Sequence, residues 1–380
     1  MTFFIKDYSE FTLLVNGMDM QIGADGLKAC TIIENTTSAL PTVSLTFCDT
    51  RLKAIPGGAF TDGAKIDIVM GDGTNPPITY NFIQWSAADI TANAAGEVAS
   101  ISAVATPIPW LTKLIAKEYT GTSSSIIQQV AQEGGITNTD MDATQDSMIW
   151  LPNSKTFHQF ARDAQDHGWM GASSSPLIAV TSDQTGQWQL RYKDILKQNP
   201  SQTMAMLPFF ATGQIPIHDF RAHSDALFHN TWVNYGYKLM QEQLDGTLAT
   251  FFNMSISSLT SNIGISSAAS GAVNLVRSLY HSPNVGNTHE HYAEAAHHNL
   301  KAQSAFTTTI HTMTNQLTTL RLLDDVNLIL ANSDGTINGA YSGVYKISSI
   351  SRHISKGNYR EKFVLMSQGI NATFSGGAGA

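Results

Sequence analysis

Two segments far apart in the chain share one spacing of strands and turns, and this repeat restricts the possible folds most. In the first, Gly63 precedes the alternating run Ile66-Asp67-Ile68, and Gly73 follows in a turn ten residues after Gly63. In the second, Asp325 precedes a Val-Asn-Leu run, and Gly335 follows in a turn ten residues after Asp325. Matching periods of this kind are the sequence signature of a duplicated structural unit.

The strands that follow extend this correspondence. Gly96 lies 33 residues after Gly63, Gly357 lies 32 residues after Asp325, and an alternating strand pattern follows each. Short strands at regular spacing are typical of a barrel or a sandwich. The sequence therefore predicts an α+β fold, mainly β, with two related antiparallel β-barrels and an inserted α/β middle domain.

The middle of the chain has helical periodicity instead. Three amphipathic helices are predicted, at Ser123–Glu133, Ser154–His167 and Thr288–Gln303. The third places Tyr292, Ala296 and Leu300 on one face, which we expect to be buried. Two β-prone runs, Trp188–Tyr192 and Asn230–Lys238, lie between the second and third helices, and Ser255–Gly271 reads as a loop.

These patterns divide the 380 residues into parts of ordinary domain size, which is roughly 100–200 residues. The predicted parts are a first β-barrel over 1–110, a middle α/β domain over 111–205 and 239–303, a second β-barrel over 206–238 and 304–372, and a flexible Gly/Ala-rich tail over 373–380.

Composition excludes several classes of protein. Charged residues make up only 14% of the chain, against about 25% in an average soluble domain, and the net charge is −8. A protein that grips phosphate backbones needs an excess of Lys and Arg, so nucleic-acid binding is not expected to be its main role. No apolar run reaches the roughly 18 residues of a membrane span, so no membrane insertion is expected, and the first residues lack the pattern of a signal peptide.

The two cysteines lie in neighbouring strand-like runs. Cys30 belongs to Leu27–Glu34, and Cys48 ends Thr42–Cys48. A hairpin that turns near Ala39 would let the two thiols face each other. The interpretation we favour is two buried free thiols in a reducing compartment, since no metal-binding cysteine spacing is present.

A histidine cluster is the strongest candidate for a chemical site. His289, His291, His297 and His298 fall within the third predicted helix. Helical metal ligands are spaced i and i+4; neither His289 nor His291 has such a partner, while Glu294 and His298 do have that spacing. We therefore favour a solvated or interface face of the helix over a metal site.

Other residue patterns also give no convincing evidence of a catalytic site. No Gly-x-Ser-x-Gly elbow or phosphate-binding loop occurs. The carboxylate pairs Asp163/Asp166 and Asp140/Asp142 fall on a helix face and in a polar loop. The run Asn332–Gly335 reads as a β-turn and not as a calcium loop. The sequence thus predicts no catalytic, cofactor-binding or metal-binding residues, no cofactor, and no enzyme.

Four stretches resemble the baseplate hub proteins of contractile phage tails and, more distantly, the head of type VI secretion spike proteins. The order and spacing of these stretches carry the resemblance, and none is a catalytic signature. They are Lys117–Ser123 with the following helix, Ser154–Gly168 with Trp169, the Asn230–Lys238 strand, and Ser342–His353 with Gly357–Tyr359 and Phe363–Leu365.

The resemblance implies a structural role in a virion. Hub proteins of this family form homotrimers, and each copy supplies two tube-like barrels to a pseudo-sixfold ring. That ring joins the tail tube to the central spike, contacts neighbouring baseplate proteins and lets DNA pass in transit. The protein would then reside in the tail baseplate after assembly in the bacterial host cytoplasm. A weakly charged, net acidic channel wall would not retain passing DNA.

Three alternatives stay open. One is a type VI spike head or another protein associated with the tail tube. Another, from a different class, is a baseplate-associated peptidoglycan hydrolase, which would need two carboxyl groups across a cleft. The third is a carbohydrate-binding β module. The roles of the His289–His298 cluster and of the tail at 373–380 are left open.

Overall fold

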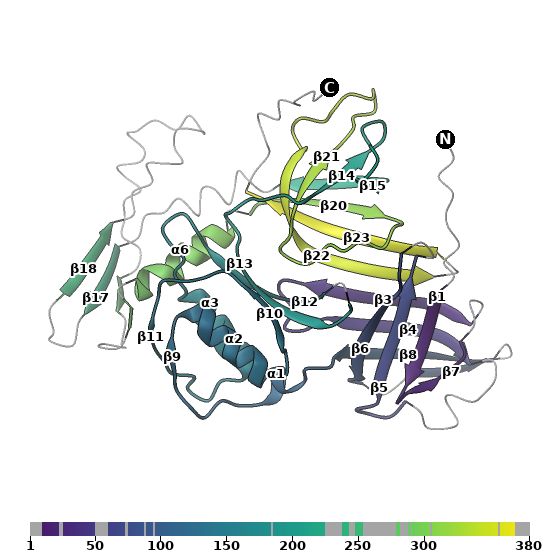
Figure 1. Ribbon diagram of the computed structural model, residues 1–380, viewed down its shortest axis with the longest axis horizontal. Coiled ribbons are helices and arrows are strands. Elements are labelled where there is room, and N and C mark those ends of the chain that lie inside the picture. Colours follow the sequence, from purple (N-terminus) through teal and green to yellow (C-terminus); the bar gives the residue numbers. More distant parts are fainter. Residues whose placement is uncertain are drawn as a thin grey trace.

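The computed structural model describes residues 10–22, 26–49, 60–72, 75–86, 89–93, 96–183, 185–224, 238–242, 248–253, 279–281, 288–289, 291–304, 306–355 and 358–368. The fold is α+β and mainly β, as predicted (Figure 1). Its largest element is a mixed sheet of 15 strands. The predicted loop at Ser255–Gly271 and the tail at 373–380 lie outside the described residues, as does most of the strand predicted at Asn230–Lys238.

The strands of the large sheet come from both ends of the sequence. They are β1 (Glu10–Val15), β2 (Met18–Asp19), β3 (Leu27–Asn35), β4 (Thr42–Asp49), β5 (Lys65–Gly71), β6 (Ile78–Gln84), β7 (Asp89–Asn93), β8 (Gly96–Ala105), β14 (Gln202–Met206), β15 (Ile215–Ile217), β16 (Phe220–Ser224), β20 (Thr308–Thr314), β21 (Asp325–Ile329), β22 (Gly343–Ser355) and β23 (Asn358–Ser367).

The remaining elements form a smaller α/β part and a separate strand group. They are α1 (Pro109–Thr112), β9 (Tyr119–Gly121), α2 (Ser123–Glu133), β10 (Asn138–Met141), β11 (Met148–Trp150), α3 (Phe157–Asp166), β12 (Pro176–Ser182), β13 (Trp188–Asp194), β17 (Lys238–Glu242), β18 (Leu248–Asn253), β19 (Leu279–His281) and α6 (Tyr292–Ser304). In the α/β part, β10, β13 and β12 form a sheet in that order, and β9 pairs with β11.

Two sets of five strands have the same arrangement. The first unit, β3-β4-β8-β6-β5, and the second unit, β16-β20-β23-β22-β21, are antiparallel at every step. The repeat seen in the sequence maps onto this order, because Ile66–Ile68 lies in β5 and Val326–Leu328 lies in β21. Among the described residues, the pairings do not close either unit into a complete ring of strands.

The long strand β22 joins the two units into one sheet. Its first residues, Gly343–Lys346, pair with β21, and Ser349–Ile354 pair with β3 of the first unit. β23 pairs along β22 on its other side. In Figure 1, the yellow β22 lies directly beside the purple β3, although the two segments are distant in the sequence.

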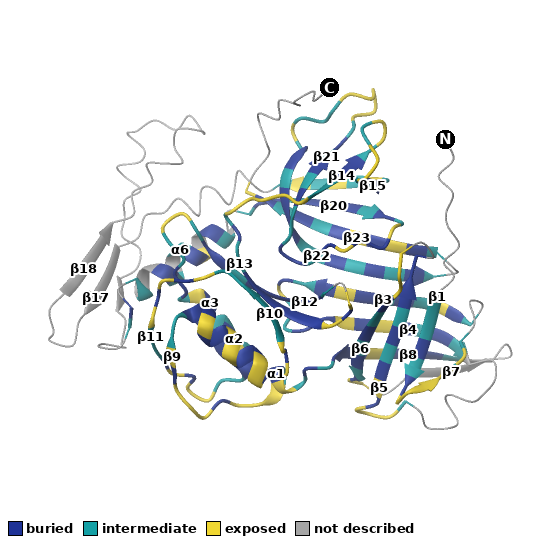
Figure 2. Ribbon diagram, viewed as in Figure 1, coloured by how far each residue is buried: buried dark blue, intermediate teal, exposed yellow. Residues whose placement is uncertain are grey.

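Alternating side chains place the core on one face of each unit. Tyr80 and Phe82 on β6 are buried, as are Phe363 and Leu365 on β23, and Figure 2 shows this alternation along the strands. Fully burying an apolar side chain of this size contributes about 1.5–3 kcal/mol. None of the helices within the described ranges is long and apolar enough to span a membrane.

The helix predictions are confirmed with small shifts. α2 has the predicted bounds, and the Thr122 hydroxyl caps its first turn. α3 begins at Phe157, three residues after the predicted start, because Thr156 and Gln159 form a capping box there.

The face predicted to be buried on the third helix is wrong. α6 buries Ala295, Asn299 and Ala302, while Leu300 is 64% exposed. This face is buried because it carries Asn299, whose amide donates to the backbone carbonyls of Asp166 at 3.0 Å and Gly168 at 2.8 Å. These carbonyls lie at the end of α3, where helices leave acceptors unpaired.

The cysteines lie in the predicted hairpin but do not face each other. β3 pairs with β4, and Cys30 lies opposite Leu45. Both thiols are free; Cys30 is buried and Cys48 is partly buried. Burial raises the pKa of the Cys30 thiol to about 12, so this thiol stays protonated.

Candidate functional site: a buried polar junction

A cluster of buried charged and polar groups joins three parts of the fold. Glu34 on β3 is fully buried and accepts hydrogen bonds from β12 of the α/β part. The donors are the Thr181 hydroxyl, the Ser182 amide at 3.0 Å and the Ser182 hydroxyl at 2.9 Å. Glu34 also forms an ion pair with Arg352 on β22. One carboxylate therefore connects the first unit, the α/β part and the second unit.

Arg352 lies between two buried carboxylates. Its guanidinium contacts Glu34 and donates from Nε to Glu361 on β23 at 3.2 Å. The guanidinium carbon lies 5.7 Å from the centre of the Tyr80 ring, within the range of a cation–π contact. Burial opposes the charge, but Glu34, Tyr80, Glu361 and Tyr359 together outweigh it and raise the pKa of Arg352 well above its ordinary value.

Glu361 completes the cluster from the second unit. It accepts the Tyr359 hydroxyl at 2.5 Å and the Thr318 hydroxyl at 2.7 Å. Burial raises the pKa of the Glu361 carboxyl, and the charge of Arg352 opposes that rise. Buried charges are tolerated only when they are paired and hydrogen-bonded, and each group here meets that condition.

The same contacts protect the edge of the small sheet. β12 is an edge strand of the β10-β13-β12 sheet. Its Ser182 amide donates to Glu34, and its Ile178 amide donates to the Gln165 side chain at 2.8 Å. Side-chain acceptors thus occupy donors that would otherwise be free to pair with another chain.

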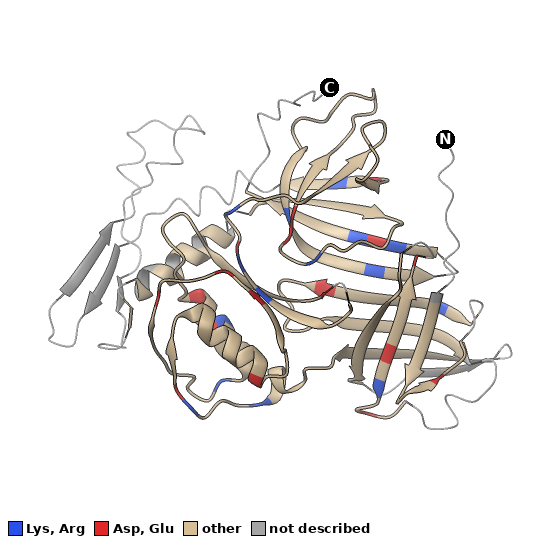
Figure 3. Ribbon diagram, viewed as in Figure 1, with Lys and Arg blue, Asp and Glu red and all other residues tan. Residues whose placement is uncertain are grey.

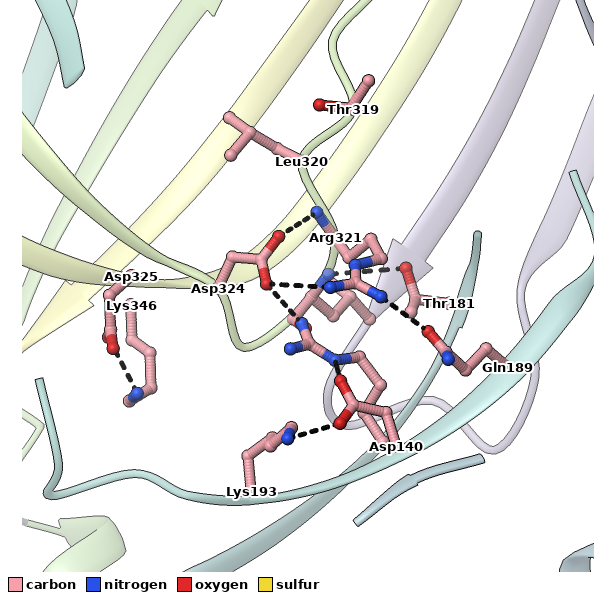
Figure 4. Close-up of polar contacts among 12 residues, drawn as sticks. Asp140, Thr181, Gln189, Lys193, Thr319, Leu320, Arg321, Asp324, Asp325 and Lys346 are labelled. Atoms are coloured by element: carbon pink, nitrogen blue, oxygen red, sulfur yellow. Dashed lines mark hydrogen bonds and ion pairs between the residues drawn. The ribbon is translucent and has the colours of Figure 1, made fainter. Parts of the chain in front are cut away.

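A second group of ion pairs fixes β13 to the second unit (Figure 4). Arg191 contacts Asp140 at 3.1 Å, Asp324 at 2.7 Å and the Leu322 carbonyl at 2.5 Å. Burial alone would raise the pKa of Asp140, but the hydrogen bond from Lys193 and the charge of Arg191 hold it below its ordinary value. The α/β part is therefore held against the loop that precedes β21.

The turn between β12 and β13 packs against β6 of the first unit. Gly186 has φ +83°, and a Cβ added there would lie 1.9 Å from the Thr79 carbonyl oxygen. Only glycine fits both the conformation and this close approach. Nearby, the Trp188 indole donates to the Asn81 carbonyl at 2.8 Å. The hairpin thus contacts both units.

The histidine cluster packs α6 against the end of α3. His291 stacks on Trp169 with ring centres 4.4 Å apart, and His298 Nε2 contacts the Ser174 carbonyl at 2.8 Å. His289 is 7% exposed and lies 2.9 Å from the His167 carbonyl. Within the described ranges, no group of three or more potential ligands could hold a metal ion. The described histidines therefore serve an internal interface; the side chain of His297 lies outside the described residues.

Burial favours the neutral form of His289. Its Nδ1 accepts the His291 amide at 3.2 Å, so Nε2 must carry the proton that is donated to His167. Burial lowers the pKa of His289, and the charges of His291 and His167 act in the same direction, while the hydrogen bond to the His167 carbonyl and the charge of Asp146 oppose them.

This arrangement predicts that the protein loses stability in mild acid. Because the folded-state pKa of His289 lies below its unfolded value of about 6.5, the contribution is present above that value. It is lost progressively as the pH falls toward the folded-state pKa. Replacing His289 with Gln should reduce the loss of unfolding free energy between pH 7 and pH 5, measured by urea titration. The exposed control His311→Gln should keep the full loss, and equal pH dependence in the two variants would contradict this role.

Three of the four carboxylates considered from the sequence form ion pairs, while the Asp166 carboxylate accepts a hydrogen bond from the Gln165 side chain. Asp163 lies 2.9 Å from Lys155, and Lys193 bridges Asp140 and Asp142. The run Asn332–Gly335 forms a turn closed by a hydrogen bond from the Gly335 amide to the Asn332 carbonyl at 3.0 Å. That prediction is confirmed.

Sequence reasoning missed the charged residues of the junction. The sequence could have revealed them through charged residues at inward-facing positions of alternating strands. Glu34, for example, follows Cys30 and Ile32 on one face of β3. Arg352 similarly lies between the inward residues Ile350 and Ile354. A charge at such a position indicates a buried partner elsewhere in the chain.

Comparisons with solved structures give a consistent result. No family model and no curated protein matches the sequence. The 43 kDa tail protein of prophage MuSo2 from Shewanella oneidensis has a similar structure, with a TM-score of 0.58, 11% identity, and coverage of 94% of this chain and 98% of that one. A tail protein from Neisseria meningitidis has a TM-score of 0.56 and 10% identity, over 96% and 98% of the two chains.

A secretion component shares the architecture at lower similarity. The E. coli c3393 protein, described as a component of the type VI secretion system with similarity to the T4 phage tail proteins gp27 and gp5, has a TM-score of 0.51. It is 9% identical, over 94% of this chain and 78% of that one. The chain therefore has the fold of phage tail proteins and of a type VI secretion component, as the resemblance found in the sequence implied.

Proposed function

We propose that the protein is a structural component of a phage tail, namely the central hub of a baseplate. Three copies would form a ring in which each copy supplies two barrel-like domains, so that the ring has pseudo-sixfold symmetry. The observation that carries this proposal is the shared order of strands in the two units and their union through β22. A duplicated unit is what a threefold assembly needs in order to match a sixfold tube.

The mechanism we propose is geometric and not catalytic. The junction around Glu34 and Arg352 fixes the two units in one relative orientation, so each copy enters the ring with a defined angle between them. The domain boundaries predicted from the sequence stay part of this proposal. The partners would be the tail tube protein, the central spike protein and neighbouring baseplate proteins.

The likeness to c3393 supports one alternative of the same kind. A head domain of a type VI secretion-like spike would use the same fold, and the two roles differ in the partners that bind the ring. Mixing the purified protein with tail tube and spike proteins from the same genome would separate them. Binding of both would support the hub.

Mass and shape in solution test the proposal. Native mass spectrometry should give three times the chain mass of 41.1 kDa, and particle images should show a ring with a central hole. A stable monomer or dimer at micromolar concentration would contradict the hub. The absence of turbidity loss on cell-wall sacculi would be consistent with a non-enzymatic role, and a clear loss would favour the hydrolase.

Charge on the solvent face of the sheet bears on DNA passage. In the second unit, Arg221, Arg360 and Lys362 are exposed, and none has an ion-pair partner among the described residues. The matching strands of the first unit carry hydroxyl side chains such as Ser44 and Ser102, and Figure 3 shows how few charges they hold. The weakly acidic channel wall expected from composition therefore requires this face to point away from the channel.

A further inference from the structure

The pairing of β22 with β3 provides a template for contact between copies. In the second unit, β22 runs as one strand beside β23 to the turn at Ser355 and Asn358, with one register shift between Ile347 and Ser349. In the first unit, two strands take this place: β6 and then β7 both pair with β8, up to the turn at Asn93 and Gly96. By strand order and pairing, β7 is thus equivalent to the second half of β22, and β3 is equivalent to β16.

These equivalences leave two matching strand edges that have no partner strand among the described residues. Within the chain, the outer edge of β3 is occupied by the second half of β22. Its equivalent β16 pairs only with β20 among the described residues, and β7 pairs only with β8. The free edge of β16 corresponds to the edge of β3 that receives β22, and the free edge of β7 corresponds to the edge of β22 that receives β3.

We propose that β7 of one copy pairs in antiparallel fashion with β16 of a second copy, which repeats between copies the β22–β3 pairing seen within one chain. This inference rests on the proposed homotrimer and names the surface by which it closes. Free strand edges are sites where chains associate by main-chain hydrogen bonds.

The ladder registers fix which residues would meet. Within the chain, Ser351 lies opposite Ile33, and His353 lies opposite Thr31. Following the registers through β8 and β4 in the first unit and through β23 and β20 in the second gives the equivalent residues. By this correspondence, Asp89 of one copy lies opposite His223 of the next copy, and Thr91 lies opposite Arg221.

Charge supports this register independently. Asp89 is exposed on β7, while Arg221 and His223 are exposed on β16. The derived pairing places the carboxylate directly across from the imidazole and diagonally from the guanidinium. Opposite charges across antiparallel strands stabilise the pairing, and like charges destabilise it.

The pairing also accounts for closure. Three seams within chains would alternate with three seams between copies, so that the sheet continues around the ring without a free edge. A head-to-tail contact of this type generates a closed ring when its rotation suits the number of copies. The seam within the chain would set the curvature for the seam between copies.

Disulfide trapping tests the register directly. In a Cys48→Ser background, which keeps the buried Cys30, Thr91→Cys and Arg221→Cys would place two thiols on opposed residues. Opposed residues in antiparallel strands have Cα atoms about 4.5–5.5 Å apart, which suits a disulfide. Mild oxidation should give covalent dimers and trimers on a non-reducing gel.

The control pair is Thr91→Cys with Ser224→Cys. The Ser224 side chain lies on the other face of β16, where it hydrogen-bonds Thr308 at 2.8 Å, so little cross-linking is expected. Native trimers that do not cross-link through 91 and 221, or that cross-link equally through the control pair, would overturn this inference and leave the hub proposal standing. A protein that is monomeric before oxidation would overturn the hub proposal itself.

A charge exchange gives a second test. Asp89→Lys should shift the trimer toward monomers in native mass spectrometry, because it sets a lysine against His223 and Arg221. Adding His223→Glu should restore part of the trimer. A single variant that assembles like the parent protein would overturn the inferred contact.

Discussion

Replacing Arg352 with Met is expected to lower the free energy of unfolding by about 3–5 kcal/mol, the cost typical of removing one partner from a buried ion pair. Glu34 and Glu361 are both 0% exposed and both contact the guanidinium. Methionine has a similar length but cannot neutralise either carboxylate. Urea titrations at a fixed protein concentration would measure the loss, since assembly adds a concentration-dependent term.

A matched control lies on the neighbouring strand. Arg360 on β23 is exposed and has no ion-pair partner among the described residues, so Arg360→Met should change stability by less than about 0.5 kcal/mol. Adding Glu34→Gln and Glu361→Gln to Arg352→Met should recover part of the loss, because no buried charge then remains. Equal effects of Arg352→Met and Arg360→Met would contradict the role of the junction.

Replacing Asp146 with Ala is expected to cost about 3–5 kcal/mol. This fully buried carboxylate accepts the Ser123 amide at 2.8 Å, the Ser123 hydroxyl at 2.6 Å and the Trp169 amide at 2.7 Å. It thereby fixes the start of α2 to the segment after α3. Its loss leaves buried donors unpaired, and each costs about 1–3 kcal/mol.

Two further variants make the Asp146 measurement specific. Asp146→Asn keeps the shape and one acceptor oxygen, so its loss should be smaller than that of Asp146→Ala. Asp334→Ala removes a carboxylate from an exposed turn and should leave stability nearly unchanged. The prediction fails if Asp146→Ala unfolds at the same urea concentration as Asp334→Ala.

Much of the local structure could be predicted because local signals determine it. α2 begins after a capping threonine and ends at Gly134, and the sequence shows both signals. The shared spacing of strands and turns likewise anticipated that β5 and β21 occupy the same place in two units. The pairing of β22 with β3 could not be predicted, because strands so distant in the sequence leave no local pattern of their partners.

The candidate site was missed for a related physical reason. A charged residue such as Glu34 normally indicates a solvent-facing position, and only its place among inward residues shows otherwise. The buried face of the third helix was predicted wrongly for a similar reason. Asn299 is buried because its amide donates to the carbonyls at the end of α3, and no hydrophobic pattern encodes that contact. Polar burial depends on partners supplied by tertiary structure, which periodicity does not reveal.

The pairing of β22 with β3 also determines when the first unit can be completed during synthesis. Arg352 follows Glu34 by 318 residues, so the ribosome completes the first unit long before its counter-charge exists. Domains commonly fold as they emerge, with the earliest part first. Here β3 keeps an open edge, and Glu34 has no cation, until β22 has been translated. Interrupted chains that stop before β22 would therefore lack a finished first unit, and they could not take the place of a complete copy in an assembly.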